Sequence, residues 1–490
     1  MNINKRVFKN IILGSAAISA LSPTLISCKK NVEEKPNIIF VFPDQMRGRA
    51  MGFLGQEPVI TPNLDNFANE SIVLTEAVCN YPISSPYRAM MLTGKYPLSN
   101  KVISNCNSKS GAFGVELQET DTCWSDLLKE NGYDTGYIGK WHLDSPYKPY
   151  VKCYNNNENM AWNEWCPPER RHGFDFWYAY GTYDQHNNPM YWTTDASRDE
   201  AVWVNQWGPE HEADIAINYI KNTDDKFRDP DKPFALVVSM NPPHMPYNQV
   251  PQNYVDLYKD KTYEDLYDRP NVDLEGDHPM SKYARKNIKN YLAMITGVDD
   301  QFGRILKALE EAGLEKNTIV VFTSDHGNCL GIHQEISKNN HYEESMRIPL
   351  MIRWPEKIKA RYDDLLISVP DMFPTLLNLV GLSDKIPETV EGVSFADLLK
   401  TGDGERPGSQ LYLKIPFDNQ GENKRGVRTL RYTLMIEKQI DNEKKYVLFD
   451  NKYDPFQLNN IAEENEDIVQ QLIKNELLAW LVKTNDNWLE

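Results

Sequence analysis

A serine and an arginine in the segment Ser84-Ser-Pro86-Tyr-Arg88 have the spacing of an anion site at the start of a helix. Pro86 suits a first helical turn, the next residues favour helix, and Gly94 is a stop signal. The Ser84 hydroxyl would then lie beside free backbone N–H groups and the positive end of the helix dipole, which stabilise an anion. Arg88 is one turn further on and can point back to the same place. The alternative is a serine that only caps the helix, with a surface arginine.

Polar residues that can do chemistry also follow four mostly apolar runs. A strand with one buried face alternates apolar and polar residues, and these runs do not. They are typical of strands buried on both faces of a parallel sheet: Asn37–Phe42, Tyr133–Ile138, Phe234–Ser239 and Thr318–Thr323. They lead into acids, a lysine and imidazoles: Asp44-Gln45, Lys140 with His142, His244, and Asp325-His326. Ligands of α/β sheets bind beyond the carboxyl ends of the strands, so we expect these side chains to meet in one crevice.

The elements between these runs predict the fold class. Helical patterns cover Thr122–Glu130, Glu212–Asn222 and Lys282–Ala312, the last with a break expected near Gly297. Strands that alternate with helices predict an α/β fold with a large, mostly parallel sheet flanked by helices. From Leu411 the apolar runs become short and mixed, which predicts a smaller antiparallel sheet closed by a helix at about 465–482. We therefore expect an N-terminal catalytic domain at residues 36–385 and a C-terminal subdomain at residues 386–490.

The first 35 residues predict export. Three basic residues precede an apolar stretch, residues 11–21, that is too short to span a bilayer. The stretch leads to Leu25-Ile-Ser-Cys28, which is similar to a bacterial lipobox in which Cys28 becomes the lipidated first residue. We expect a lipoprotein signal peptide at residues 1–27 and a tether at residues 28–35. The lipid would anchor a periplasmic or cell-surface protein of a Gram-negative bacterium; the alternative is signal cleavage nearby, with Cys28 incidental.

Composition excludes several classes of protein. The chain has 490 residues, of which 41% are hydrophobic and 25% charged, as in an ordinary globular protein and unlike a disordered chain or a coiled coil. The 53 basic and 70 acidic residues give a net charge of −17, which disfavours binding of nucleic acid across the whole surface. An anionic substrate must therefore meet a local group of cations. The cysteines form no Cys-x-x-Cys pair, which disfavours a zinc ribbon or a thioredoxin-type site.

The motifs together resemble a known family. Ser84-x-Pro-x-Arg88, followed by Leu-Thr-Gly94, is similar to the signature of the type I sulfatases of the alkaline phosphatase superfamily, in which the first Ser or Cys becomes formylglycine. Further motifs follow in the family's order over about residues 36–465: Asp44-Gln45, Gly139-Lys140-x-His142, Pro242-Pro-His244, Asp325-His326-Gly327, Lys338 and Tyr453-Asp-Pro455. The resemblance implies an alkaline phosphatase-like fold and a hydrolase that removes O-sulfate from a sugar of a sulfated glycan, as bacterial glycan sulfatases do.

The resemblance also implies a cofactor set. Formylglycine (3-oxoalanine) would form from Ser84, and the Ser-type motif implies an anaerobic, radical-based sulfatase-maturating enzyme as a partner. In the hydrated aldehyde one hydroxyl attacks sulfur and the other later expels sulfate, whereas a plain serine would leave an ester that is hard to hydrolyse. One calcium ion is expected, since most of the implied ligands offer oxygen: Asp44, Gln45, modified Ser84, Asp325 and, with nitrogen, His326.

The remaining catalytic roles come from the same resemblance. Arg88 would hold the formylglycine in place, and Lys140 and Lys338 would stabilise charge on the sulfate oxygens. Two histidines would move protons: His142 as the base that collapses the sulfated hydrate, and His244 as the acid that protonates the leaving oxygen.

Substrate contacts are expected in the aromatic-rich stretch at residues 152–208. Its tryptophans and tyrosines suit sugar rings, and they equally suit a buried insertion. We predict that His186, Arg198 and His211 contact hydroxyl or carboxylate groups of a sulfated oligosaccharide. Two other functions stay open: a phosphomonoesterase or phosphodiesterase that uses unmodified Ser84, and a non-catalytic glycan-binding lipoprotein in which Ser84 is never converted.

Overall fold

The computed structural model describes residues 34–267, 269–418, 422–439 and 443–489. The predicted signal peptide, Cys28 and most of the predicted tether lie outside the described residues. Residues 35–490 form one compact unit. Within the described ranges, none of the helices is both long enough and apolar enough to pass through a membrane.

A ten-stranded sheet forms the centre of this unit, in the order β10-β2-β9-β8-β1-β7-β3-β4-β5-β6. The strands are β1 Asn37–Pro43, β2 Ile72–Leu74, β3 Asp134–Lys140, β4 Phe176–Tyr180, β5 Met190–Thr193, β6 Val202–Trp203, β7 Phe234–Met240, β8 Thr318–Thr323, β9 Leu350–Arg353 and β10 Arg361–Asp363. Strands β8, β1, β7, β3 and β4 are mutually parallel neighbours, and the antiparallel pairs lie outside them. The predicted α/β fold with a mostly parallel sheet is confirmed.

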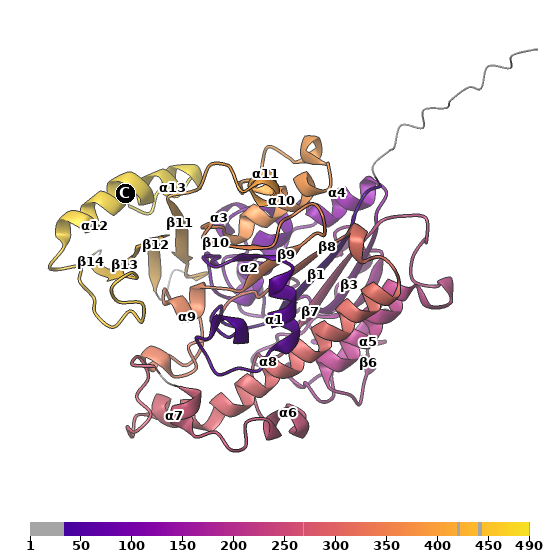
Figure 1. The fold of residues 1–490 in the computed structure, drawn as a ribbon, viewed down its shortest axis with the longest axis horizontal. Coiled ribbons are helices and arrows are strands. Elements are labelled where there is room, and N and C mark those ends of the chain that lie inside the picture. The colour runs from indigo at the N-terminus through magenta and orange to yellow at the C-terminus, as the bar shows by residue number, and fades with distance from the viewer. Residues whose placement is uncertain (1–33, 268, 419–421, 440–442, 490) are drawn as a thin grey trace, which may run out of the picture. The chain divides into compact units, whose positions relative to one another are not determined.

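Helices cover both faces of the sheet (Figure 1). The α-helices of the described residues, including two that pack on a second sheet, are α1 Pro62–Asn69, α2 Ser84–Thr93, α3 Pro97–Asn100, α4 Trp124–Glu130, α5 Gly208–Lys221, α6 Gln252–Asp256, α7 Tyr263–Leu266, α8 Pro279–Glu311, α9 Glu343–Met346, α10 Met372–Leu379, α11 Ala396–Thr401, α12 Glu466–Leu472 and α13 Leu478–Lys483. Successive side chains of β1 lie on opposite faces of the sheet, in two hydrophobic cores. Phe40 belongs to the core that includes residues of α2, α4 and α10, and Val41 to the core that includes residues of α1, α5 and α8. Burial on both sides explains why the β1 sequence is apolar from Ile38 to Phe42.

The predicted break of the long helix at Gly297 is wrong. Helix α8 continues without interruption from Pro279 to Glu311. A Cβ atom at Gly297 would lie 2.5 Å from Cη2 of Trp207 and 3.1 Å from Cδ2 of Tyr254. The glycine is therefore explained by the close approach of two aromatic rings to the helix, and not by a change of backbone direction.

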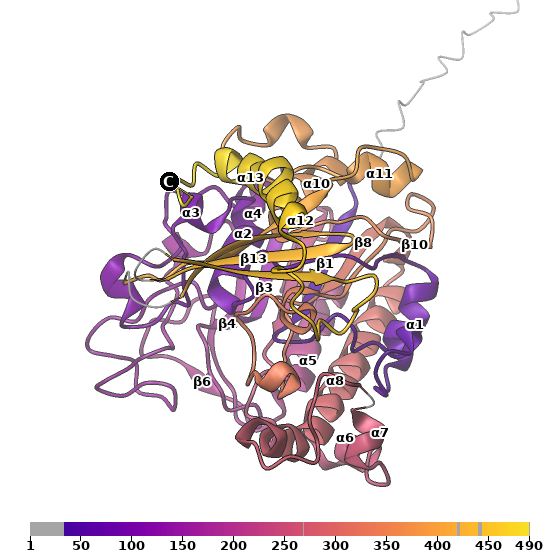
Figure 2. The same ribbon diagram turned by 90° about the vertical axis from the view of Figure 1, so that its left-hand side faces the viewer.

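A second, four-stranded antiparallel sheet follows, as predicted (Figure 2). Its strands are β11 Ser409–Lys414, β12 Asn423–Thr429, β13 Tyr432–Lys438 and β14 Lys444–Asp450. One face packs against α12, a π-helical segment at Ile473–Leu477, and α13, which together form the predicted closing helix. The other face contributes apolar residues to a small cluster with Met346: Tyr412, Met435, Val447 and Phe449. The proposed domain boundary at residues 385/386 stays a prediction.

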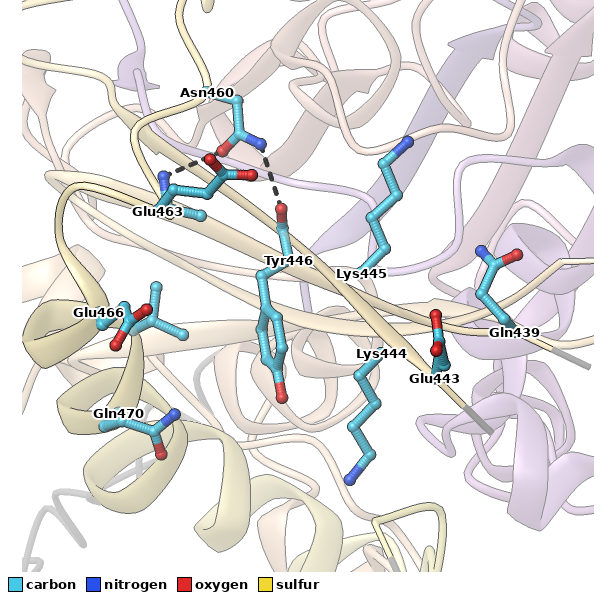
Figure 3. Close-up of a pocket in the computed structure, with 11 residues that line it drawn as sticks. Gln439, Glu443, Lys444, Lys445, Tyr446, Asn460, Glu463, Glu466 and Gln470 are labelled. Atoms are coloured by element: carbon cyan, nitrogen blue, oxygen red, sulfur yellow. Dashed lines mark hydrogen bonds between the residues drawn. The ribbon is translucent and has the colours of Figure 1, made fainter. Parts of the chain in front are cut away.

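A hollow of about 800 Å³ lies between β14 and α12 (Figure 3). Tyr446, Glu466 and Gln470 line it, and Asn460 closes one side by donating to the Tyr446 carbonyl and accepting from the Ala462 N–H. Of the predicted site residues that the structure describes, none lines this hollow. The predicted chemistry therefore lies elsewhere in the unit.

Candidate active site

The four predicted strand ends lie side by side, because β8, β1, β7 and β3 are neighbours in the sheet. The backbone N–H of Asp44 donates to Met240 O (2.8 Å), which extends the β1–β7 pairing by one residue. Lys140 Nζ lies 2.7 Å from Asp44 Oδ2, and the Gln45 N–H donates to Asp325 Oδ1 (2.9 Å). The predicted crevice is thus built from residues at the carboxyl ends of buried strands or just beyond them.

Ser84 lies inside this crevice and is only 1% exposed. It is the first residue of α2, after the capping residue Ile83, and its hydroxyl does not cap the helix. The hydroxyl donates to Asp44 Oδ2 (3.1 Å) and lies 3.3 Å from His326 Nε2 and 3.4 Å from Lys338 Nζ. The alternative of a helix-capping serine with a surface arginine does not describe this site.

The acidic residues at the strand ends fit a bound cation. Ligand atoms of Asp44, Asp325 and His326 all lie within 4.8 Å of one another, and the three residues are fully buried. Asp44 Oδ1 has no hydrogen-bond partner among the described residues, which is costly for a buried oxygen unless a ligand satisfies it. Burial and the charge of Asp44 raise the pKa of Asp325 to about 7, because two adjacent carboxylates repel each other. A divalent cation between them would remove this repulsion.

Gln45 stands beside these carboxylates in a left-handed backbone conformation (φ 72°). Its side-chain amide donates to Ser337 Oγ (2.6 Å), and its Oε1 lies 3.4 Å from Lys338 Nζ. The side-chain oxygen of Gln45 therefore lies near Lys338 Nζ, as the Ser84 hydroxyl does. Calcium is commonly coordinated by amide oxygens.

Three cationic side chains, Arg88, Lys140 and Lys338, surround the Asp44 carboxylate that contacts Ser84. Arg88 is buried and donates from Nη2 to Asp44 (3.2 Å) and from Nη1 to the Lys140 carbonyl (2.6 Å). Burial opposes ionisation of Asp44, but the charges of Lys140 and Lys338 outweigh it and hold its pKa well below the usual value. Burial lowers the pKa of Lys338. The chain thus has the local cations that an anionic substrate requires, despite its net negative charge.

The two predicted proton-transfer histidines lie in different environments. His142 is buried in a left-handed conformation (φ 54°), with Nε2 3.0 Å from Cys106 O and with no partner for Nδ1 in the part of the chain that the structure describes. Burial and the charge of Lys140 hold its pKa well below the usual value, so its imidazole is neutral. His244 Nδ1 lies 3.4 Å from Asp184 Oδ1 and 2.8 Å from Met245 O. Burial and the charges of Lys338 and Lys140 lower the pKa of His244.

Asp184 and Asn241 are polar residues of the crevice that sequence reasoning missed. Asn241 Oδ1 accepts from Lys140 Nζ (3.1 Å), and its amide donates to Asp184 Oδ1 (3.3 Å). Asn241 follows β7 directly, so the rule of strand ends already offered a signal for it. Asp184 lies in an irregular loop, where no periodicity marks it.

The three predicted substrate contacts are placed differently. His186 is buried beside the crevice, with Nε2 2.9 Å from the carbonyl oxygen of His244. Arg198 forms a bidentate salt bridge with Glu164, and both N–O distances are 2.7 Å. His211 Nε2 lies 2.8 Å from the Tyr178 hydroxyl. The geometry brings His186 to the site, whereas Arg198 and His211 hydrogen-bond to residues of the aromatic-rich stretch.

Comparison with known proteins agrees with this geometry. Residues 36–382 match the sulfatase family model, and residues 331–483 match the model of the N-sulphoglucosamine sulphohydrolase C-terminal region. An endo-4-O-sulfatase from Bacteroides thetaiotaomicron is 43% identical over 487 residues, 93% of each chain. An ulvan-active sulfatase from Formosa agariphila is 33% identical over 99% of this chain and 90% of its own.

Solved structures agree as well. The crystal structure of a Bacteroides fragilis protein described as a sulfatase is 50% identical, with a TM-score of 0.88 over 92% of this chain and 97% of the other. These matches confirm the predicted family, the alkaline phosphatase-like fold and the class of enzyme. The chain therefore belongs to the sulfatase family and is a sulfatase.

Proposed function

We propose that this sulfatase hydrolyses an O-sulfate ester on a sugar of a glycan, with a formylglycine made from Ser84 and one calcium ion. The observation that carries the proposal is the position of the Ser84 hydroxyl within 3.4 Å of Asp44, His326 and Lys338 in a buried cluster. The similarity to an endo-4-O-sulfatase and an ulvan-active sulfatase supports a sulfated glycan as the substrate.

The calcium ion would be held by a mixed set of ligands: Asp44, Gln45, Asp325, His326 and the modified side chain at residue 84. Carboxylate and amide oxygens favour calcium over zinc, and the unpartnered Asp44 Oδ1 supports a ligand at this position. When bound, such an ion lowers the pKa of the nucleophile and holds sulfate oxygens.

The modified residue would be the nucleophile. A maturating enzyme of the anaerobic, radical-using class would remove two hydrogens from Ser84, since the motif carries serine in place of cysteine. The hydrated aldehyde supplies one hydroxyl to attack sulfur and a second whose loss of a proton expels sulfate. Arg88 would hold the modified residue 84 beside Asp44. Arg88 Nη2 itself donates to Asp44 Oδ2 (3.2 Å).

The remaining residues would stabilise charge and move protons. Lys140 and Lys338 would bind the sulfate oxygens in the transition state. Neutral His142, with its unpartnered Nδ1, can accept a proton. His244 would protonate the leaving oxygen: an anionic substrate that offsets the charges of Lys140 and Lys338 raises the pKa of His244 toward its ordinary range.

The proposed location follows from the N-terminal sequence. Residues 1–27 would direct export, and Cys28 would carry the lipid that anchors a periplasmic or cell-surface protein. Residues 36–385 would be the catalytic domain and residues 386–490 a C-terminal subdomain. Substrate contacts from His186, Arg198 and His211 remain part of this proposal.

The mass of the peptide that contains Ser84 tests the proposed nucleophile. In protein purified from its native host, we expect this peptide to lack two hydrogens relative to the encoded sequence, and the protein to hydrolyse sulfate esters. An unmodified serine together with turnover of phosphate esters would instead identify a phosphoesterase. An unmodified serine without turnover of either ester would identify a glycan-binding protein.

Replacement of His244 by alanine tests the proposed acid. We expect kcat for an alkyl sugar sulfate to fall by about 10²–10⁴-fold, and kcat for an aryl sulfate to fall far less, because a phenolate leaves without full protonation. Steady-state kinetics on a sulfated sugar and on p-nitrophenyl sulfate give the two values. Equal losses on both substrates would assign the acid role to another residue.

A further inference from the structure

A cavity of about 580 Å³ adjoins the candidate active site, between residues 333–342 and the second face of the four-stranded sheet. Lys338 forms part of its wall, and Lys338 Nζ lies 3.4 Å from Ser84 Oγ. The cavity and the reaction centre therefore share a cation. Met435, Val447 and Phe449 line the cavity from the sheet and form an apolar surface there.

A row of charged residues crosses the whole sheet along this cavity. Lys414 is paired with Lys424, Lys424 with Glu437, and Glu437 with Lys445, so the four residues stand in register on the four strands. All four line the cavity. Two lysines in directly opposite positions repel each other. Glu422 offsets this repulsion, because it pairs with both Lys414 and Lys424.

The charge of this wall is not fully compensated. Among the described residues, four lysines and three glutamates line the cavity, and Lys445 forms no ion pair with any of them. Figure 3 shows that the side chains of Lys445 and Lys444 leave β14 in opposite directions. A chain with a net charge of −17 thus keeps one more lysine than glutamates in this wall, next to its reaction centre.

His341 supplies a second, independent observation. It lines the cavity and is 7% exposed, yet neither of its ring nitrogens has a hydrogen-bond partner in the described part of the chain. Its ring stacks on Tyr342 (4.5 Å) and lies parallel to Phe449 (5.9 Å). Burial, followed by the charge of Lys424, lowers its pKa to about 3, so the imidazole is neutral and offers one donor and one acceptor. A neutral donor and acceptor suit a sugar hydroxyl.

We propose that this cavity is a binding subsite for an anionic sugar that neighbours the sulfated sugar in the same glycan chain. The lysine row would bind the carboxylate or sulfate of that sugar, His341 a hydroxyl, and the apolar surface the C–H face of the ring. This inference rests on the proposed function. Because Lys338 belongs to both sites, the preferred substrate is an oligosaccharide or polysaccharide with charge on adjacent sugars, and not an isolated sugar sulfate.

Binding to a protein that cannot turn over separates the subsite from catalysis. In the calcium-loaded Ser84→Ala protein, titration calorimetry with a chondroitin 4-sulfate tetrasaccharide gives the Kd. Adding Lys445→Glu is expected to raise this Kd at least tenfold. The matched control, Lys444→Glu, changes the charge on the opposite face of the same strand and should leave the Kd within twofold. Equal Kd values for the Lys445 and Lys444 variants would overturn the proposal.

Further ligands and one more variant make the test specific. An unsulfated chondroitin tetrasaccharide carries only carboxylates, and a sulfated galactan tetrasaccharide carries only sulfates, so the one that loses affinity in the Lys445→Glu protein identifies the anion. His341→Ala should also weaken binding about tenfold, with its melting temperature checked separately. If wild-type enzyme hydrolyses no sulfate ester while binding still depends on Lys445, the proposed function fails and the subsite stands. If turnover occurs and no variant alters binding, only the subsite fails.

Discussion

Ser84→Ala is expected to lower kcat/KM for sulfate esters by on the order of 10⁴-fold or more, because the variant has no oxygen that can be converted to an aldehyde. Folding should be retained. The change removes the buried hydrogen bond to Asp44 and the longer contacts with His326 and Lys338, and the loss of one buried hydrogen bond costs about 1–3 kcal/mol of unfolding free energy. Kinetics on p-nitrophenyl sulfate and urea unfolding measure the two effects separately.

Ser85→Ala is the matched control for this prediction. Ser85 is also buried, but its hydroxyl donates to the His142 carbonyl (2.7 Å) and does not contact the acidic cluster. We expect the Ser85 variant to keep the modification at residue 84 and to lose far less activity than Ser84→Ala. Activity of Ser84→Ala within tenfold of the wild type would refute Ser84 as the nucleophile.

Removal of divalent metal is expected to abolish most activity, with a loss of at least about 10²-fold, and to lower the melting temperature. Without a cation, Asp44 and Asp325 repel each other, as the raised pKa of Asp325 indicates. Because calcium would bind only the folded protein, it raises the free energy of unfolding. At 100 times its Kd the increase is about 2.7 kcal/mol. Activity and thermal unfolding are measured after treatment with EDTA and after return of calcium or magnesium.

Asp325→Asn checks that the effect arises at this site. Because one charged ligand is lost, the variant should show a much smaller calcium-dependent rise in melting temperature than the wild type. Full activity in protein shown by elemental analysis to hold no metal would contradict the proposed calcium site. Recovery with magnesium alone would keep the site and change the ion.

The sequence alone determined the type of sheet and most of the crevice. In the run Asn37–Phe42, every residue from Ile38 onward is apolar, and a strand covered on both faces needs that pattern. Parallel strands present their carboxyl ends at one edge, so Asp44, Lys140 and Asp325 could be expected to meet. The family signature around Ser84 added the nucleophile, which periodicity could not identify.

The tertiary structure decided which strands are neighbours and what the loops contribute. Asp184 lies in an irregular loop, and Lys338 is held beside Ser84 by contacts between residues far apart in the chain. Gly297 shows the same limit, since its role depends on Trp207, which lies 90 positions earlier in the sequence. The lysine row is another example, because cross-strand register is set by how four short strands pair. The spacing of apolar residues indicates which face of a helix or strand is buried. Contacts between residues far apart in the sequence are set only when the whole chain packs.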